Sequence, residues 1–353
     1  MKALVVIAAG GTGGHINAAL ALGEAFEAQG FRVRYFSGMR PLDHKLYAGR
    51  AVTHLESWPL RTKNPLTLLK AALKNLLVFV QLLRVFWGER PAIAAGAGGY
   101  VCGPVLLAAR LLGARVYIFE QNAVMGLTNR LLAYVAHLVF VHFKETRRLP
   151  EGLRRKVRVV GNPTRATIIR PQPRARAAEL RVLIFGGSLG ARQLNAQAER
   201  LAAEGIGAPL HIVHQSGDDV APVTGLAPGV RYEKHKYLDH IQRQYEWADV
   251  IVARAGASTV SELRIVGKPA FLVPFPGATD NHQWWNAKQL QAEAGFTVEV
   301  VPAEVTEAQL RAGLRAFLER ASSGGLSASQ SGPAAVESTQ QALREMLSHA
   351  RLI

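Results

Sequence analysis

Short apolar runs rich in valine, isoleucine and leucine alternate with stretches of helical periodicity along almost the whole chain. Runs that are apolar at successive positions are typical of parallel strands buried on both faces of a sheet. The first half of the chain predicts strands at Leu4–Ala8, Arg32–Phe36, Ala92–Ala95, Val116–Glu120 and Leu138–Val141. The second half predicts strands at Arg181–Phe185, Leu210–His214, Val250–Ala253, Ala270–Val273 and Val298–Val301. Because strands and helices alternate, the pattern predicts an α/β architecture with parallel sheets.

Each half begins in the same way, with a strand that runs into a glycine turn and then into a helix. The turns are AAGGTGGH at 8–15 and FGGSLGAR at 185–192, and a Pro/Arg/Ala segment at 171–179 has the composition of a linker. We therefore expect two doubly wound, Rossmann-like domains, residues 1–163 and 164–337, whose strand ends face a central cleft. The terminal segment 338–353 is expected to form an amphipathic helix that packs back on the first domain.

The first glycine turn, residues 10–15, does not have the pattern of a dinucleotide-binding site. Counted from Gly11, the final glycine position of G-x-G-x-x-G is occupied by Ile16, and no acidic residue closes the second strand. The lysine of a phosphate-binding P-loop is also absent. What remains is either a structural tight turn or a loop whose amides and helix N-terminus suit an anionic, oxygen-rich ligand. His15 stands at the start of that helix, where the helix dipole disfavours the imidazolium, so it is either a cap or a proton acceptor.

A second loop of small residues follows the predicted strand Val250–Ala253. Its sequence, RAGASTVSE at 254–262, leads from a strand into a helix, and the amides of Gly256–Thr259 are suited to hold a diphosphate without a metal ion. Glu262 is either an acceptor for ribose hydroxyls or simply a favourable acid in the first helical turn.

A dense polar stretch, PFPGATDNHQWWNA, occupies residues 274–287. Polar side chains after a buried strand predict a hydrogen-bonding site for sugar hydroxyls, although Trp284 and Trp285 are equally consistent with ordinary core packing. The spacing of His, Asp and Glu in this stretch does not suggest a metal site.

Composition narrows the class of protein. The chain has 353 residues, of which 49% are hydrophobic and 19% charged, which suits a globular protein of two domains. The single cysteine, Cys102, excludes an intramolecular disulfide, and the short apolar N-terminal run leads straight into a glycine turn, so we expect a buried strand and a cytoplasmic protein. The net charge of +16 attracts polyanions such as anionic lipid or diphosphates. Nucleic acid is the weaker hypothesis, because no recognition motif accompanies the charge.

Taken together, the motifs resemble the MurG family of N-acetylglucosaminyltransferases, which glycosylate a lipid-linked peptidoglycan intermediate. The resemblance extends over most of the chain, in the order GGTGGH (10–15), AGAGGYVCGP (95–104), EQNAVMGLTNR (120–130), GNPTR (161–165), GGSLGAR (186–192), RAGASTVSEL (254–263) and DNHQWWNA (280–287). It implies a glycosyltransferase-B fold, a UDP-N-acetylglucosamine donor, a lipid-linked muramoyl-pentapeptide acceptor and inversion at the anomeric carbon, with no cofactor required.

The resemblance also implies roles for individual residues. Those expected to bind the donor are Thr12, Gly13, Gly14, Asn122, Arg165, Ser188, Leu238, Ala257, Ser258, Thr259, Val260, Ser261, Glu262, His282 and Gln283. Tyr100 and Asn129 are expected at the acceptor. Inversion by one displacement requires a base for the attacking hydroxyl, and His15 is the first candidate and Glu120 the second.

Two departures from the family pattern concern the sugar contacts more than the reaction. The segment after His15 lacks the proline that is usual there, and Gly277 stands where a histidine is common, with His282 where a glutamine often stands. The alternatives left open are another UDP-sugar enzyme of the same fold, a UDP-sugar epimerase, or a non-catalytic basic protein that binds membranes or nucleotides.

A leucine-rich segment between Arg61 and Trp87 bears on localisation. Its longest charge-free piece, Asn75–Leu83, is far shorter than the roughly 20 residues of a spanning helix. Apolar residues recur at helical spacing with basic residues around them: Leu66, Leu69, Leu73, Leu76, Leu77 and Val80, with Lys63, Lys70, Lys74 and Arg84. Such a segment is either ordinary core or a basic amphipathic helix that lies on an anionic membrane. With the family resemblance, it predicts a peripheral protein on the cytoplasmic face of the bacterial membrane.

Overall fold

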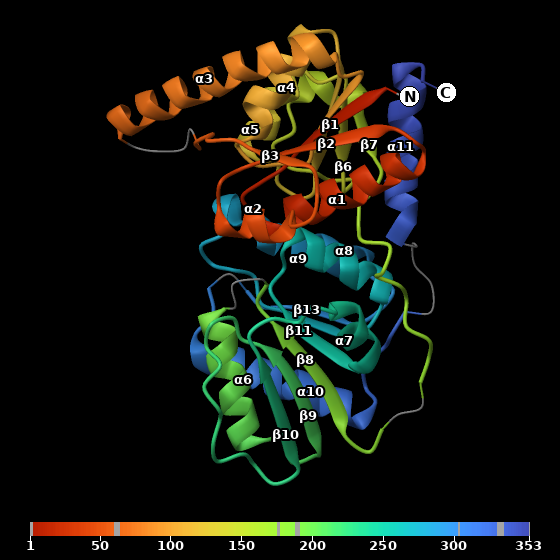
Figure 1. Ribbon diagram of the computed structural model, residues 1–353. Helices are drawn as coiled ribbons and strands as arrows, with labels where there is room; N and C mark the ends of the chain where they lie inside the picture. Colours follow the sequence, from red (N-terminus) through yellow and green to blue (C-terminus); the bar gives the residue numbers. More distant parts are fainter. Residues whose placement is uncertain are drawn as a thin grey trace. The chain divides into compact units, whose positions relative to one another are not determined.

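The computed structural model describes residues 3–59, 64–174, 177–187, 191–302, 304–329 and 335–352, and the chain divides into two compact units. The first unit comprises Met1–Ala166 and Ala335–Ile353, and the second comprises Thr167–Ala334. The boundaries expected from the sequence, 163/164 and 337/338, lie close to these divisions. Each unit has its own parallel sheet, so the predicted α/β fold with two Rossmann-like halves is confirmed (Figure 1).

The sheet of the first unit has seven strands in the order β3-β2-β1-β4-β5-β6-β7. They are β1 (Leu4–Ala8), β2 (Arg32–Ser37), β3 (Val52–His54), β4 (Ile93–Gly96), β5 (Arg115–Glu120), β6 (Leu138–Val141) and β7 (Val157–Val159). The helices are α1 (Gly13–Ala28), α2 (Pro41–Leu46), α3 (Pro65–Glu89), α4 (Cys102–Leu111), α5 (Leu127–Leu132), the short 3-10 helix η1 (Glu151–Lys156) and α11 (Ala335–Ala350).

Alternate residues of β1 enter two different core clusters, which explains why the whole strand is apolar. Val6 packs in a cluster with α3 and α4, whereas Val5 and Ile7 pack in a cluster with α1 and α11. Both faces of the sheet are therefore covered by helices, as Figure 1 shows.

The chain returns to the first unit through α11. Four α11 residues join the core cluster that contains Val5 and Ile7: Ala342, Leu343, Met346 and Leu347. In addition, the Tyr117 hydroxyl of β5 donates a hydrogen bond to the Met346 carbonyl at 3.1 Å. The last helix is thus an integral layer of the first unit.

The sheet of the second unit has six strands in the order β10-β9-β8-β11-β12-β13. They are β8 (Leu180–Phe185), β9 (Leu210–Gln215), β10 (Val230–His235), β11 (Val250–Ala253), β12 (Ala270–Leu272) and β13 (Val298–Val300). The helices are α6 (Arg192–Glu204), α7 (Ile241–Trp247), α8 (Ala257–Val266), the 3-10 turn η2 (Thr279–Asn281), α9 (His282–Glu293) and α10 (Glu307–Ser323). Leucines of α6 and α10 pack in one cluster with Val182, Ile184 and Val252 of the sheet.

Candidate active site

In both sheets the strand order reverses at one place, between β1 and β4 in the first unit and between β8 and β11 in the second. At such a switch point the loops at the carboxyl ends of the two central strands diverge to opposite faces, and ligands of open α/β sheets bind there. The glycine turns found in the sequence lie at these two places.

The β1–α1 turn is the first of these loops. The side chain of Thr12, the N-cap of α1, accepts a hydrogen bond from the His15 amide at 3.4 Å. Gly13 and Gly14 form the first helical positions and are partly exposed. The first amides of a helix have no partner within the helix, so this turn offers donors to an anionic or hydroxyl-rich ligand.

His15 is held on two sides. Its Nδ1 lies 3.2 Å from the Gly10 carbonyl oxygen, and since a carbonyl only accepts, Nδ1 carries the proton of the neutral ring. Nε2 is then the nitrogen with the lone pair, as a general base requires. The β4–α4 loop packs closely against the ring at Gly98. A Cβ at this position would lie 2.6 Å from His15 Cδ2 and 2.8 Å from Nε2. Gly98 also has φ +106°, which side-chain-bearing residues rarely adopt.

Tyr100, an expected acceptor contact, lies beside the same turn. The guanidinium of Arg40 is 5.5 Å from the centre of its ring and donates a hydrogen bond to the Gly11 carbonyl at 3.1 Å. Sequence analysis did not single out Arg40, which is exposed and follows Gly38 at the end of β2.

Glu120, the second candidate base, is 3% exposed at the end of β5. Its Oε1 accepts bonds from the amide of Asn122 at 3.0 Å and from Nδ2 of Asn122 at 3.2 Å. Its Oε2 accepts bonds at 2.9 Å from the amide of Gly126 and from Nδ2 of Asn129. Since these four donors occupy its acceptor positions, the geometry favours an organising role for Glu120 in the loop 120–129 over proton abstraction. The loop brings Glu120, Asn122 and Asn129 into one cluster, although the sequence assigns Asn122 to the donor and Asn129 to the acceptor.

In the second unit, α8 begins where the sequence placed the diphosphate loop. Its N-cap is Gly256, which has no side chain to satisfy the first amides, and Ala257, Ser258 and Thr259 are partly exposed in the first turn. Val260, by contrast, is fully buried and packs inward. Glu262 is 6% exposed, and its Oε2 accepts a 2.7 Å hydrogen bond from the Tyr245 hydroxyl. The exposed first turn is therefore the part of this loop that suits an anion.

The start of α9 is tied to the loop that follows β12. The side chain of Gln283 accepts a bond from the amide of Phe275 at 2.9 Å, and Nδ1 of His282 donates to the Thr279 carbonyl at 2.8 Å. Trp284 and Trp285 are in edge-to-face contact and partly exposed, so they are not fully buried core residues.

Arg254 donates hydrogen bonds to the loop that follows β12. It is 8% exposed, donates to the carbonyls of Val273 and Pro274 at 3.0 Å, and has its pKa lowered by burial. These contacts make Arg254 a support for the loop.

The side-chain amide of buried Gln215 positions Leu238, whose backbone was expected to contact uridine. Oε1 of Gln215 accepts a bond from the Leu238 amide at 2.9 Å, while its Nε2 donates to the Gly187 carbonyl at 2.8 Å. Gln215 thus connects the glycine turn after β8 to the segment after β10. Ser188 of that turn lies outside the described residues. Five of the residues expected to bind the donor belong to the first unit: Thr12, Gly13, Gly14, Asn122 and Arg165. The others belong to the second unit.

Comparison with known proteins assigns the family. Residues 5–141 match the glycosyltransferase family 28 N-terminal domain, and residues 181–343 match the glycosyltransferase family 28 C-terminal domain. The UDP-N-acetylglucosamine–N-acetylmuramyl-(pentapeptide) pyrophosphoryl-undecaprenol N-acetylglucosamine transferase of Pseudomonas fluorescens (strain Pf0-1) is 39% identical over 302 residues, which are 83% of this chain and 83% of that protein. The protein of the same name from Ectopseudomonas mendocina (strain ymp) is 38% identical over 317 residues, 87% of each.

The chain belongs to the MurG family of glycosyltransferases. The crystal structure of Acinetobacter baumannii MurG is similar to it with a TM-score of 0.75 and 29% identity, over 98% of this chain and 100% of that chain. The family recognised from the motifs, the fold and the enzyme class are confirmed by these comparisons.

Two residues of this MurG-family chain that sequence analysis missed hold the switch-point loops: Asp43 and Gln215. Gln215 is the last residue of the buried strand β9 and precedes Ser216-Gly217, a position where a polar residue points to a loop contact. Asp43 lies on the short helix α2, but its partner Gly11 is 32 residues away, so no local pattern shows the contact.

Among the described residues, no group of three or more His, Cys, Asp or Glu side chains is placed to hold a metal ion. In each unit, the first backbone amides of one helix, α1 in the first unit and α8 in the second, are groups that suit an anion.

Proposed function

We propose that this enzyme transfers N-acetylglucosamine from UDP-N-acetylglucosamine to the 4-hydroxyl of the muramoyl sugar of undecaprenyl-diphospho-muramoylpentapeptide, with inversion at the anomeric carbon. The observation that carries the proposal is the identity of 39% to a transferase of that name over 83% of the chain, a span far larger than any single motif. The product is the second lipid-linked intermediate of peptidoglycan synthesis.

In the mechanism we propose, His15 takes the proton from the attacking hydroxyl while the UDP group leaves. Its support is the hydrogen bond from Nδ1 to the Gly10 carbonyl, which leaves the lone pair on Nε2. The first-turn amides of α8, at Ala257–Thr259, would hold the diphosphate as negative charge develops on it. Because backbone amides and the helix dipole supply the counter-charge, the proposal requires no metal cofactor.

The remaining donor and acceptor contacts belong to the same proposal. Thr12, Gly13, Gly14 and Asn122 would close over the donor, and Glu262, Leu238 and Arg165 would contact the nucleoside. His282 and Gln283 would contact the donor sugar, and Tyr100 and Asn129 the acceptor. For Gln283 the support is its position at the start of α9, where its side chain already accepts a bond from a loop amide.

The test of the reaction is UDP release from UDP-N-acetylglucosamine with and without the lipid-linked acceptor, using UDP-glucose as a control donor. We expect release that depends on the acceptor, is confined to the N-acetylglucosamine donor and persists in EDTA. Release without acceptor, together with formation of an isomeric sugar, would identify an epimerase instead. Loss of activity in EDTA with recovery in magnesium would contradict the metal-free mechanism alone.

The test of the base is His15→Ala, with His54→Ala as the matched control. Both histidines donate from Nδ1 to a glycine carbonyl in the first unit, His54 to Gly38 at 2.7 Å. General-base catalysis contributes roughly 10²–10⁴-fold, so His15→Ala should lower kcat by that order with donor KM nearly unchanged. His54→Ala should leave kcat near that of the wild type. A His15→Ala enzyme within a few-fold of wild type would remove the base assignment.

We also propose that α3 attaches the enzyme to the cytoplasmic face of the membrane as a peripheral protein. By length and composition α3 is the one helix among the described residues that could span a bilayer. However, Val78, Leu82 and Phe86 on one face of α3 pack in the core of the first unit, so spanning would require that face to detach. The opposite face exposes Leu66, Leu69, Leu73, Leu76, Leu77 and Val80. An amphipathic helix of this kind suits the interface plane.

Basic residues on α3 supply a lipid preference that can be measured. Lys63 lies outside the described residues, and Lys74 is paired with Glu56 at 2.8 Å, so Lys70 and Arg84 remain as the main contributors. At about 1 kcal/mol for each basic residue near an anionic surface, the two favour anionic over neutral vesicles by roughly 30-fold.

Flotation with phosphatidylglycerol vesicles and with phosphatidylcholine vesicles tests this preference. Leu77→Asp, at a position 60% exposed, should abolish binding, whereas Ile169→Asp, at an equally apolar position 69% exposed but off α3, should not. Absence of binding to both vesicle types would refute the membrane proposal without touching the reaction.

A further inference from the structure

Asp43 is a fully buried carboxylate that the mechanism above does not use. It lies on α2, directly beneath the β1–α1 turn, and none of its surface is exposed. Its Oδ1 accepts a hydrogen bond from the Gly11 amide at 2.9 Å, and its Oδ2 accepts one from the Arg40 amide at 3.1 Å. A buried carboxylate is costly unless hydrogen bonds compensate it, so its place beneath the turn calls for an explanation.

The amide that Asp43 holds belongs to the peptide group that also holds His15. The N–H of the Gly10–Gly11 peptide donates to Asp43 Oδ1, and the C=O of the same peptide accepts from His15 Nδ1 at 3.2 Å. In a trans peptide the N–H and C=O point in opposite directions, and the described bonds contain no cis peptide. One peptide group therefore stands between the carboxylate and the imidazole, with a hydrogen bond on each side.

We propose that Asp43 is a positioning residue for His15 and acts through the Gly10–Gly11 peptide group; this inference rests on the proposed role of His15 as the base. The carboxylate fixes the orientation of the peptide, and the peptide carbonyl fixes the ring and its Nδ1–H tautomer. A chain of hydrogen bonds polarises each member, so the carboxylate also favours the imidazolium that forms when His15 takes a proton.

The surroundings of the peptide leave it few other orientations. Gly11 has φ +85°, and a Cβ on Gly10 would lie 3.1 Å from the Gly38 amide nitrogen and 3.5 Å from Asp43 Oδ1. Arg40, the charged neighbour on the other side, donates from its guanidinium to the next carbonyl, that of Gly11. Two hydrogen bonds thus tie the turn to the segment 38–43, and only the one that Asp43 accepts involves the Gly10–Gly11 peptide that His15 contacts.

The alternative is that Asp43 only stabilises the turn. In that case its removal would impair every function of the turn, and the loss would be independent of His15. If Asp43 acts through His15, its removal should have little further effect once the imidazole is gone. A double-mutant cycle separates the two, because coupling appears only between residues that act through each other.

The experiment measures kcat and donor KM for Asp43→Asn, His15→Ala and the double variant. Asn is nearly isosteric but places an amide N–H₂ where one carboxylate oxygen accepted a bond. In serine proteases the same change of a carboxylate in direct contact with the histidine lowers kcat by about 10⁴-fold, so through one peptide we expect roughly 10- to 100-fold. Donor KM should stay within about twofold, and the double variant should match His15→Ala within about threefold.

A pH profile adds a readout that loss of structure alone would not move. Arg40 and the N-terminus of α1 remain near His15 in the variant, and only the negative charge is removed. The acid limb of the kcat profile of Asp43→Asn should therefore move to lower pH, since the imidazolium loses a favourable neighbour. Asp249→Asn is the matched control: Asp249 Oδ2 accepts a bond from the Arg181 amide at 2.9 Å in the second unit, and its removal should move neither the limb nor the coupling.

A measurement on the wild-type protein keeps the test decisive if Asp43→Asn does not fold. Nitrogen-15 NMR of labelled histidine, with His15 assigned by its loss in His15→Ala, should show the Nδ1–H tautomer. The Nε2–H tautomer would overturn the inference, because the Gly10 carbonyl would then face a lone pair. A double variant whose loss is the product of the single losses would overturn it as well. If His15→Ala itself retains full activity, the base assignment fails and the inference fails with it, an outcome distinct from the other two.

Discussion

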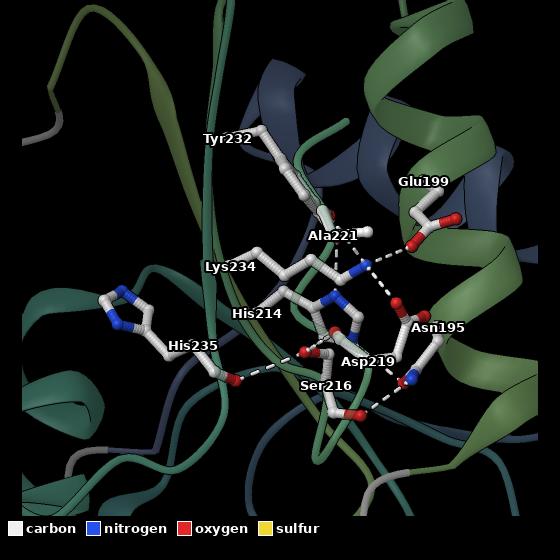
Figure 2. Close-up of polar contacts among 9 residues, drawn as sticks. All are labelled: Asn195, Glu199, His214, Ser216, Asp219, Ala221, Tyr232, Lys234 and His235. Atoms are coloured by element: carbon white, nitrogen blue, oxygen red, sulfur yellow. Dashed lines mark hydrogen bonds and ion pairs between the residues drawn. The ribbon is translucent and has the colours of Figure 1, made fainter. Parts of the chain in front are cut away.

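His214 is buried in the second unit in a polar network, and we expect its neutral form to contribute measurably to stability. Figure 2 shows the ring between Tyr232 and Asn195, with Nδ1 2.6 Å from the tyrosine hydroxyl and Nε2 3.1 Å from Asn195 Oδ1. Because Nδ2 of Asn195 donates to the Ser216 carbonyl, its Oδ1 faces the ring and Nε2 carries the proton. Burial, and then the nearby charge of Lys234, lower the pKa of His214 to about 4, while Asp219 opposes them.

The size of the effect follows from the difference between the two states. The unfolded chain has the ordinary value of 6.5 for this histidine, so between pH 4 and 6.5 it binds more protons than the folded chain, and stability falls as the pH falls. Linkage then gives a loss of about 2 kcal/mol between pH 7 and pH 5 and about 3 kcal/mol once the pH is below 4. Replacing His214 by glutamine removes this pH-dependent part and leaves a constant penalty for the altered network.

The assay is hydrogen exchange of peptides that cover β9 and β10, in urea at pH 7, 6 and 5, which reports on the second unit separately from the first. The difference in free energy of unfolding between wild type and His214→Gln should narrow by about 2 kcal/mol from pH 7 to pH 5. Tyr232→Phe is a graded comparison: it leaves the titrating group but removes a bond that the neutral ring accepts, so its difference from wild type should narrow by less than that of His214→Gln. A constant difference for His214→Gln would refute the reasoning, since it would mean that His214 does not resist protonation in the folded protein.

Three further predictions concern the first unit. Gly98→Ala would place a Cβ 2.6 Å from the His15 ring at φ +106°, and we expect kcat to fall by about tenfold or more, with donor KM unchanged. Unchanged steady-state kinetics would contradict the described position of the ring. Glu120→Gln would turn an amide N–H₂ toward two N–H donors, which should lower stability by about 2–6 kcal/mol in thermal unfolding. A loss below about 1 kcal/mol would mean that Glu120 does not organise its loop, and would restore it as a candidate base. Met346→Ala, at a fully buried position on α11, should destabilise the first unit by about 2–5 kcal/mol, and exchange in the peptides of β1 and β5 should report it. Protection lost only in α11 itself would show that the helix is not part of that core.

The central strands were predictable because a strand that is buried on both faces consists of consecutive apolar residues. Every strand expected from such runs is present, with ends that differ by at most one residue. The strands that sequence analysis missed are β3, β7 and β10, each at the edge of its sheet. Most of their residues are partly exposed, and β10, Val230–His235, carries polar side chains through its length. An edge strand exposes one side to solvent, so its pattern resembles that of a loop.

The same distinction holds for the candidate site: its local turns were predictable from the sequence, and its long-range contacts were not. Glycine turns and the start of α8 follow a strand directly, so local sequence indicates both their conformation and their position at the carboxyl edge of a sheet. The contacts of Asp43 and Gln215 join segments 32 and 28 residues apart, and only the tertiary fold brings them together. For Glu120, the number of donors around its carboxylate could not be counted from the sequence, so the sequence alone makes it a candidate base.

The return of α11 to the first unit also bears on the order in which the protein is made. The second unit is contiguous, Thr167–Ala334, and its sheet can form as soon as those residues have left the ribosome. The first unit cannot be completed then, because the side of its sheet that carries Val5, Ile7 and Tyr117 is covered partly by α11, which is synthesised after the whole second unit. Until α11 has left the ribosome, that part of the apolar surface is open to chaperones and to self-association. A truncation that removes α11 would therefore impair the first unit, whose strands are translated before the second unit.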